Sequence, residues 1–389
     1  MNPPALSSRH VVLSLALLWL GGVGLRLTIL APPPVISFIH ADLRMSETEV
    51  GILSGLPAAL FALAAVPGSL LIARFGALSA LTIGLLATAV GSALRGAAPN
   101  VALLYAATIV TGFGVAVMQP ALPPLVRAWL PTRIGFATAV YTNGLLVGEI
   151  LPVALTLPLV LPLTGSWRWS FVVWGALCAV IAAIIWPLAP RAQAAATTAP
   201  RKWWPDWKSG LIWQLGVMLG SVNAMYFATN FFMPRYLHET GRDDIIGAAL
   251  TSLNVGQIPA SILLLMIAGG IERKRWPYIA TGVPCLAAVL LIVFGNSFWV
   301  IAGASLMGFA AAGILVLMLA LPPLLSPPED VHRTAAAMFT ISYSIAVIVP
   351  VLSGVFWDLS GKPAMAFVPI GLCCLLLVVP AFKITIKPH

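Results

Sequence analysis

Charged side chains are scarce in this chain. Asp, Glu, Lys and Arg make up 8% of its 389 residues, and 60% of the residues are hydrophobic. A water-soluble globular domain has about a quarter of its residues charged, so the composition excludes that class. Apolar runs long enough to cross a bilayer recur from Val11 to Lys383, and short turns between them collect the charged residues. The sequence therefore predicts an all-α integral membrane protein.

Cysteine is scarce as well, and sequence signatures of catalysis are missing. The four cysteines fall inside apolar runs and lack the spacing of metal ligands, so we interpret them as packing or lipid-facing residues. The chain contains no nucleotide-binding glycine loop, nucleophile motif or metal cluster. We therefore expect no cofactor, no metal and no enzymatic activity. A membrane enzyme or a sensor is the alternative from a different functional class.

An internal repeat divides the predicted helices into two sets of six. The sequence ALPPL at 121–125 recurs at 320–324, 199 positions later, and Pro152 corresponds to Pro350. We therefore expect twelve transmembrane helices in two pseudo-symmetric six-helix bundles, at 1–190 and 210–389, joined by a cytoplasmic linker at 191–209. The twelve spans are expected at 11–39, 48–73, 77–95, 100–126, 134–163, 168–189, 210–237, 245–271, 277–295, 298–325, 334–360 and 364–386.

The net charge of +9 indicates orientation rather than a nucleic-acid partner, because of how it is distributed. If both termini are cytoplasmic, 14 of the 21 Lys and Arg residues fall on that side, and five, among them Arg95 and Arg168, fall on the other. Cytoplasmic loops of membrane proteins carry such an excess of basic residues. We therefore expect a multi-pass protein of a bacterial inner membrane with both termini in the cytoplasm. We also expect it to be a monomer.

Several segments resemble the major facilitator superfamily. Segment 69–76, SLLIARFG, resembles that family's first cytoplasmic loop motif, with Ser69 in place of the leading glycine and Ala73 in place of the acidic residue. Segments 119–125 (QPALPPL), 129–131 (WLP) and 141–144 (YTNG) are similar to the cyanate and nitroimidazole transporter branch. The resemblance covers essentially the whole chain, and it implies the major facilitator fold of two six-helix bundles with a central cytoplasmic loop.

Two charged residues, Arg26 and Glu149, lie in the middle of predicted membrane spans. Charges at the bilayer centre cost about 2.5 to 3.5 kcal/mol on insertion scales, and they persist where they pair, line an aqueous cavity or meet a charged ligand. Arg26 lies 17 residues after Arg9, and Glu149 lies 16 after Arg133. Each is therefore about 24 to 26 Å from its cytoplasmic anchor, so the two share one depth and can form a pair. A permanent salt bridge between two helices is the structural alternative.

The predicted helix 134–163 also departs from the pattern of proton-coupled drug antiporters. Gly135, Gly144 and Gly148 match the glycine spacing of those exporters, but Glu149 stands where the family has a proline. Close helix packing explains such glycines equally well. The departure weakens the exporter interpretation without excluding it.

Polar residues form stripes on two helices of the second half. Asn223, Tyr226 and Asn230 share one helical face, and Asn254 and Gln257 share another with Ser261. Either stripe can line a cavity or make interhelical hydrogen bonds worth about 0.6 kcal/mol each. We interpret them as a cavity lining, with Gln119 and Tyr343 as weaker candidates nearer the cytoplasm.

These residues together suggest the chemistry of the transported solute. The guanidinium of Arg26 suits the negative end of a small anion or a compact polar heterocycle, and the amides offer donors and acceptors. We therefore expect a secondary transporter for such a solute, coupled to protons through Glu149, with protons and the bilayer as its other partners. The alternative is a proton-driven exporter of drugs or metabolites, which a central arginine disfavours for cationic compounds.

Overall fold

The computed structural model describes residues 8–45, 47–190, 202–267, 271, 272, 274 and 276–381. Among these residues there are helices and turns and no β-strand. The first part of the predicted linker, 191–201, lies outside the described residues. Contacts between Cα atoms divide the chain into two compact units, one of residues 1–205 and 327–336, the other of residues 206–326 and 337–389.

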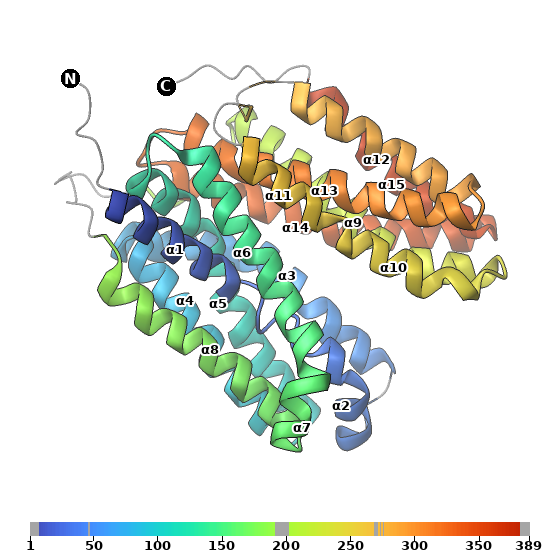
Figure 1. Cartoon of the computed structure of the whole chain (residues 1–389), viewed down its shortest axis with the longest axis horizontal. Helices are drawn as coiled ribbons and strands as arrows, with labels where there is room; N and C mark the ends of the chain where they lie inside the picture. Colours follow the sequence, from blue (N-terminus) through green and yellow to red (C-terminus); the bar gives the residue numbers. More distant parts are fainter. Residues whose placement is uncertain are drawn as a thin grey trace. The chain divides into compact units, whose positions relative to one another are not determined.

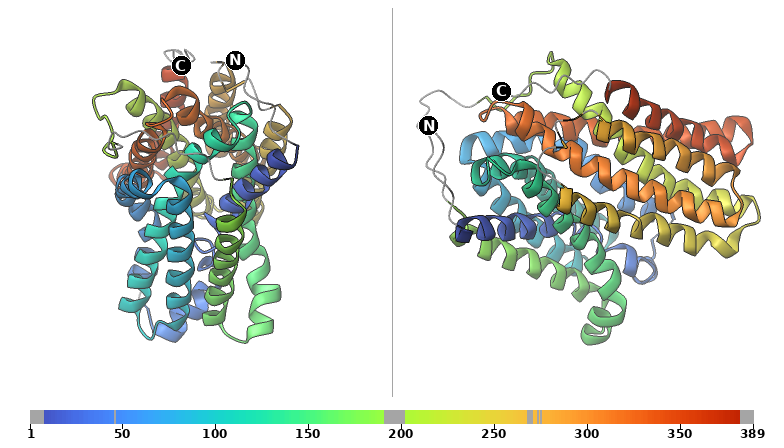
Figure 2. Two further views of the ribbon diagram at one scale, coloured as in Figure 1. Left: turned by 90° about the vertical axis from the view of Figure 1, so that its left-hand side faces the viewer. Right: turned by 45° about the horizontal axis from the view of Figure 1, so that its top comes forward.

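Helices run side by side within each unit (Figures 1 and 2). The first unit contains α1 (Ser8–Gly24), η1 (Pro33–Val35), α2 (Ile36–Leu43), α3 (Glu47–Phe75), α4 (Ala77–Ala97), α5 (Val101–Trp129), α6 (Ile134–Leu155), η2 (Thr156–Val160), α7 (Leu161–Thr164) and α8 (Trp167–Leu188). The second contains α9 (Gly210–Glu239), η3 (Asp243–Ile245), α10 (Ile246–Val255), α11 (Gln257–Ile267), α12 (Trp276–Phe294), α13 (Ser297–Leu325), most of α14 (Val331–Ser360), η4 (Pro363–Ala366) and α15 (Phe367–Ala381).

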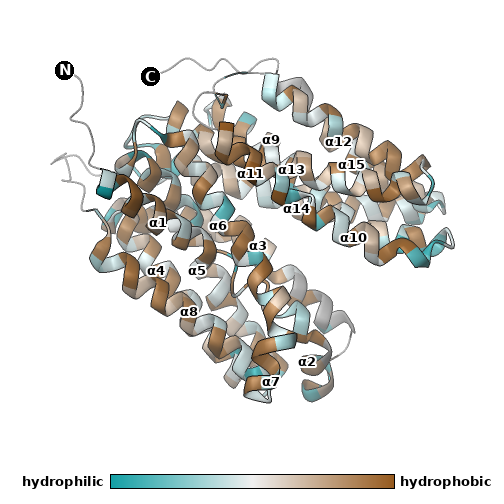
Figure 3. Ribbon diagram, in the orientation of Figure 1, coloured by the Kyte–Doolittle hydropathy of each residue, from teal (hydrophilic) through white to brown (hydrophobic). Residues whose placement is uncertain are grey.

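The helices have the length and composition of membrane spans. Ten helical segments of the described residues are long and apolar enough to cross a bilayer, and two shorter apolar helices lie at Ser8–Gly24 and Pro363–Leu377. Hydrophobic residues dominate the helices, and hydrophilic ones gather at several helix ends (Figure 3). This arrangement confirms the predicted all-α membrane fold, with one to three helical elements for each of the twelve expected spans.

Small residues allow the helices of the first unit to pack closely. A Cβ added at Gly91 of α4 would lie 2.5 Å from the Thr111 hydroxyl and 2.6 Å from its backbone nitrogen on α5. Close approach through small residues is the usual basis of helix association in membranes, where burial of apolar surface gives little advantage over contact with lipid. Helix α4 also packs against α8, so it lies between α5 and α8.

Three predicted spans are interrupted rather than continuous. The expected helix 11–39 ends at Gly24 and resumes after three consecutive prolines, which donate no backbone hydrogen bond and disfavour helical geometry in the residue before them. The expected helix 134–163 contains a π-helical turn, η2, after Pro152. The expected helix 245–271 breaks at Gly256 between α10 and α11. We call residues 25–32, between α1 and η1, the unwound segment.

Candidate functional site

Arg26 and Glu149, predicted to share one depth, are in contact. The Nε atom of Arg26 lies 3.3 Å from Oε1 of Glu149, and the side chains are 10% and 25% exposed. The guanidinium also lies over the ring of Phe61 on α3, 5.7 Å from its centroid. The structure thus pairs an arginine of the unwound segment with a carboxylate on α6. Both side chains are largely buried.

Glycines on both helices bring α1 and α6 close enough for this pair. A Cβ at Gly22 would overlap the carbonyl oxygen of Tyr141, and one at Gly144 would overlap that of Trp19. The indole of Trp19 donates a hydrogen bond to Oδ1 of Asn143, at 3.0 Å. The packing explanation for the glycines of this span therefore holds at Gly144, which touches α1 through its backbone.

Arg26 itself lies in the unwound segment, where the continuous helical hydrogen bonds of α1 give way to turns with bonds of three- and four-residue spacing. The amides of Leu25 and Arg26 bond the carbonyls three residues before them, at 3.1 and 3.2 Å. Non-helical backbone at membrane depth is tolerated where it is buried in protein or lines an aqueous cavity, because its polar groups need partners. In transporters, such discontinuous helices commonly form the solute site.

A second arginine, Arg95 of α4, supplies one of these partners. Its Nη2 donates to the carbonyl oxygen of Thr28 at 2.6 Å, and its guanidinium lies 4.8 Å from the centroid of the Phe171 ring. Arg95 is 1% exposed. The charge count above places it among the outer interfacial residues, but it is buried within the helix bundle. Its spacing from Thr88, Gly91 and Ser92 on one face of α4 is the sequence signal that indicates this.

In the second unit, four predicted residues form one hydrogen-bonded network. The Tyr226 hydroxyl donates to Oδ1 of Asn254 at 2.5 Å and accepts from Nε2 of Gln257 at 2.8 Å. Nδ2 of Asn254 donates to Oδ1 of Asn230 at 3.0 Å. The break at Gly256 falls between Asn254 and Gln257, and Nε2 of Gln257 also donates to the Asn254 carbonyl at 3.4 Å. We call these four residues the amide network.

The remaining predicted residues lie elsewhere. Asn223 donates from Nδ2 to the Ser342 hydroxyl on α14, at 2.8 Å, so it contacts a different helix from Tyr226 and Asn230. Tyr343 is buried on α14 with its ring stacked on Phe339, at 6.3 Å between centroids. Gln119 is buried on α5 of the first unit. The stripe that begins at Asn223 therefore serves two helix contacts rather than one.

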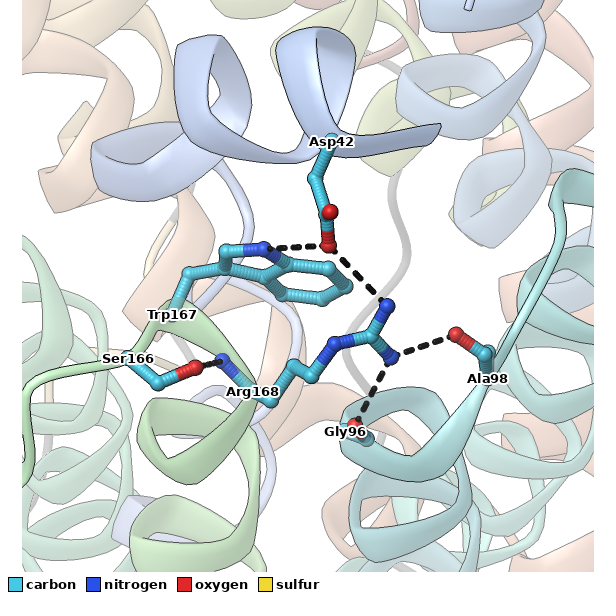
Figure 4. Close-up of polar contacts among 6 residues, drawn as sticks. All are labelled: Asp42, Gly96, Ala98, Ser166, Trp167 and Arg168. Atoms are coloured by element: carbon cyan, nitrogen blue, oxygen red, sulfur yellow. Dashed lines mark hydrogen bonds and ion pairs between the residues drawn. The ribbon is translucent and has the colours of Figure 1, made fainter. Parts of the chain in front are cut away.

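A further polar cluster, missed in the sequence, ties together three elements at one end of the first unit (Figure 4). Arg168 at the start of α8 pairs with Asp42 of α2, Nη2 to Oδ2 at 3.0 Å, and its Nη1 donates to the carbonyls of Ala98 at 2.6 Å and Gly96 at 3.3 Å. The Trp167 indole also donates to Asp42, at 3.2 Å. Arg168 is partly exposed, so this cluster fits a structural joint between helix ends.

Comparisons with known proteins agree with this architecture. The family model described as Major Facilitator Superfamily matches residues 18–292. The cyanate transport protein CynX of Escherichia coli is 26% identical over 94% of this chain and 95% of its own length, and the 2-nitroimidazole transporter of the same organism is 22% identical over 96% of each chain. The solved structure of the proton:xylose symporter XylE superposes with a TM-score of 0.76 at 12% identity, covering 97% of this chain and 96% of that one.

The family match covers well over half of the chain, and both relatives align over nearly its whole length. The likeness to the xylose symporter concerns the fold, since so few residues are identical. The chain therefore belongs to the major facilitator superfamily, as a multi-pass membrane transporter of a small solute.

Proposed function

We propose that this chain is a secondary active transporter of a small anionic or polar organic solute, of the class of cyanate-like anions and nitrogen heterocycles. The observation that carries the proposal is the Arg26–Glu149 ion pair beside the break in α1. An arginine fork binds planar or linear anions through several N–H groups, whereas a carboxylate can take up and release a proton. The names of the two relatives, which refer to cyanate and 2-nitroimidazole, support the same class.

In the proposed cycle, Glu149 and the solute compete for Arg26. A proton neutralises Glu149 and weakens its attraction to the guanidinium, so Arg26 becomes available for the negative end of the solute. One proton and one monovalent anion then move together, and the transported step is electroneutral. The two bundles rock to expose the loaded site to the other side, which is the usual alternating-access motion of such folds.

The second unit contributes polar contacts in this proposal. The amide network, with Asn223, offers the donors and acceptors that a polar solute needs, and the fixed orientation of its members favours specificity. Gln119 and Tyr343 are assigned as further solute contacts. We propose a monomer in a bacterial inner membrane with cytoplasmic termini, and labelling of Thr197→Cys from the outside of intact cells would contradict that orientation.

The alternative function, a proton-driven efflux antiporter, is supported less by the structure than by the sequence. Its favourable signal is the glycine spacing of α6, and two of those glycines, Gly144 and Gly148, are accounted for by contact with the backbone of α1. The position of Arg26 also opposes a cationic drug, because like charges repel most strongly in a poorly hydrated site.

Ligand screening by thermal shift tests the proposal. Purified protein is heated with cyanate, azide, imidazole or 2-nitroimidazole, and with choline as a cationic control. A ligand of the native state raises the melting temperature as its concentration exceeds its Kd. We expect stabilisation by at least one anion or azole and none by choline. Stabilisation by choline alone would overturn the assigned solute class.

A further inference from the structure

Arg95 is an arginine buried inside a membrane-spanning bundle. It is 1% exposed, and the described residues show no carboxylate paired with it. Burial of an uncompensated cation is among the costliest arrangements in a membrane protein, so such residues usually have a function. Its contacts, all in the first unit, indicate what that function is.

Those contacts point to the unwound segment. Nη2 donates to the Thr28 carbonyl at 2.6 Å, a short distance that is typical of a charge-assisted hydrogen bond. The Thr28 carbonyl has lost its helical partner, because the chain from residue 32 onward carries three prolines in a row. Arg95 therefore supplies the donor that an intact helix would have supplied.

Neighbouring side chains hold the guanidinium in place. Its carbon lies 4.8 Å from the centroid of the Phe171 ring on α8, which favours a cation over the ring face. The Ser92 hydroxyl donates to the Phe171 carbonyl at 2.7 Å and lies 3.4 Å from Nη2 of Arg95. A second contact, just before the unwound segment, comes from Cys178 of α8, whose thiol donates to the carbonyl of Gly24, the last residue of α1, at 3.8 Å.

We infer that Arg95 is a positioning residue that holds the unwound segment at Thr28 and thereby sets Arg26, two residues away, against Glu149. Side chains of α4 and α8 make these contacts, and they fix the position of the unwound segment relative to the two helices. An effect of Arg95 on solute affinity is expected only if Arg26 binds the solute, as proposed above. The ordering of residues 25–32 by Arg95 does not depend on that proposal.

The experiment measures the segment and the solute affinity separately. Backbone amide exchange is followed by mass spectrometry in peptides that cover 25–32, and binding is measured with azide, a linear three-atom anion isoelectronic with cyanate. For Arg95→Met we expect faster exchange confined to the unwound segment and an azide Kd raised about tenfold or more, the range of a lost hydrogen bond to a charged group. Arg95→Lys, which keeps a charge and a donor, should recover part of both.

Arg168→Met is the matched control. Arg168 also donates to backbone carbonyls at one end of the unit, but these belong to Gly96 and Ala98 at the end of α4, and its ion pair is with Asp42 (Figure 4). Its removal should leave the azide Kd within about twofold of wild type, well inside the effect of one lost hydrogen bond. If Arg95→Met does not fold, Arg95→Gln, which keeps an N–H donor without the charge, is judged by the same two measurements.

Two results would overturn the inference: unchanged exchange in 25–32 for the Arg95 variant, or faster exchange spread evenly over the whole unit with an unchanged azide Kd. If wild-type protein binds none of azide, cyanate, imidazole and 2-nitroimidazole, the proposed function fails instead, and the exchange measurement still decides whether Arg95 holds the segment.

Discussion

Gly148 of α6 lies directly against the carbonyl oxygen of Val23 on α1, so closely that a Cβ at this glycine would overlap it. Gly148 comes one residue before Glu149, and Val23 comes three residues before Arg26. Backbone thus meets backbone immediately beside the ion pair. The separation of the two charges is therefore set by a glycine as well as by their own attraction.

Gly148→Ala should force α1 and α6 apart. We expect a loss of stability of about 1 to 3 kcal/mol, because overpacking a close helix contact displaces backbone rather than a flexible side chain. Thermal unfolding in detergent measures the loss. The matched control is Gly55→Ala on α3, where a Cβ meets no atom within 4 Å and alanine is the better helix former. Equal melting temperatures for Gly148→Ala and wild type would contradict this account of the contact.

Arg26→Lys should weaken binding of azide and cyanate strongly while the protein stays folded. Lysine keeps the charge but loses the planar fork that engages an anion through several N–H groups. Arg26→Ala should bind more weakly still. Isothermal titration at fixed pH gives the Kd values, and a melting curve of each variant establishes folding. Wild-type affinity in a folded Arg26→Ala protein would remove Arg26 from the solute site.

Tyr226→Phe removes a single oxygen and with it two hydrogen bonds of the amide network, because that hydroxyl donates to Asn254 and accepts from Gln257. We expect the Kd for imidazole to rise by up to about tenfold, the value of one ordinary hydrogen bond. Asn223→Ala, which affects a contact with α14, should have a smaller effect. The control is Tyr236→Phe, whose hydroxyl donates to the Val293 carbonyl outside the network. An effect as large in Tyr236→Phe would indicate general destabilisation.

The sequence predicts the fold well because apolar length and charge position carry most of the information in a membrane protein. Helix count and the depth shared by Arg26 and Glu149 follow from the length and spacing of the predicted helices. Breaks are harder to predict, since glycine and proline are common in transmembrane helices that remain continuous. The break at Gly256, between the stripe residues Asn254 and Gln257, is an example.

Arg95 shows the other limit of sequence reasoning. A basic residue in the last turn of a transmembrane helix ordinarily extends toward the interface. Its shared face with Ser92 indicates that Arg95 turns inward, but only the tertiary fold identifies the Thr28 carbonyl as its partner. Its role depends on a carbonyl released by the three prolines of a different segment. A pairing of this kind, between a side chain and the backbone of a distant break, leaves no periodic pattern in the sequence.

Glu149→Gln distinguishes a proton carrier from a permanent structural bridge. The amide mimics the neutral carboxyl, so it no longer competes strongly for Arg26, and the solute should still bind. Accumulation in liposomes driven by an imposed pH gradient should fail, because the variant has no proton to move with the solute. Uptake of the solute down its own gradient is measured in the same liposomes as the control for insertion and folding.

The pH dependence of binding gives an independent readout of the same residue. In wild type, azide affinity should increase as the pH falls, since protonation of Glu149 releases Arg26 for the anion; at high pH the carboxylate is charged and holds the guanidinium. In Glu149→Gln the azide affinity should no longer change with pH and should stay at the high value that wild type reaches at low pH. If the ion pair is instead a permanent structural bridge, Glu149→Gln should lower the free energy of unfolding by about 3 to 5 kcal/mol, because Arg26 is left buried without its partner. A Glu149→Gln protein that melts far below wild type, or that still accumulates solute against its gradient, would rule out Glu149 as the proton carrier.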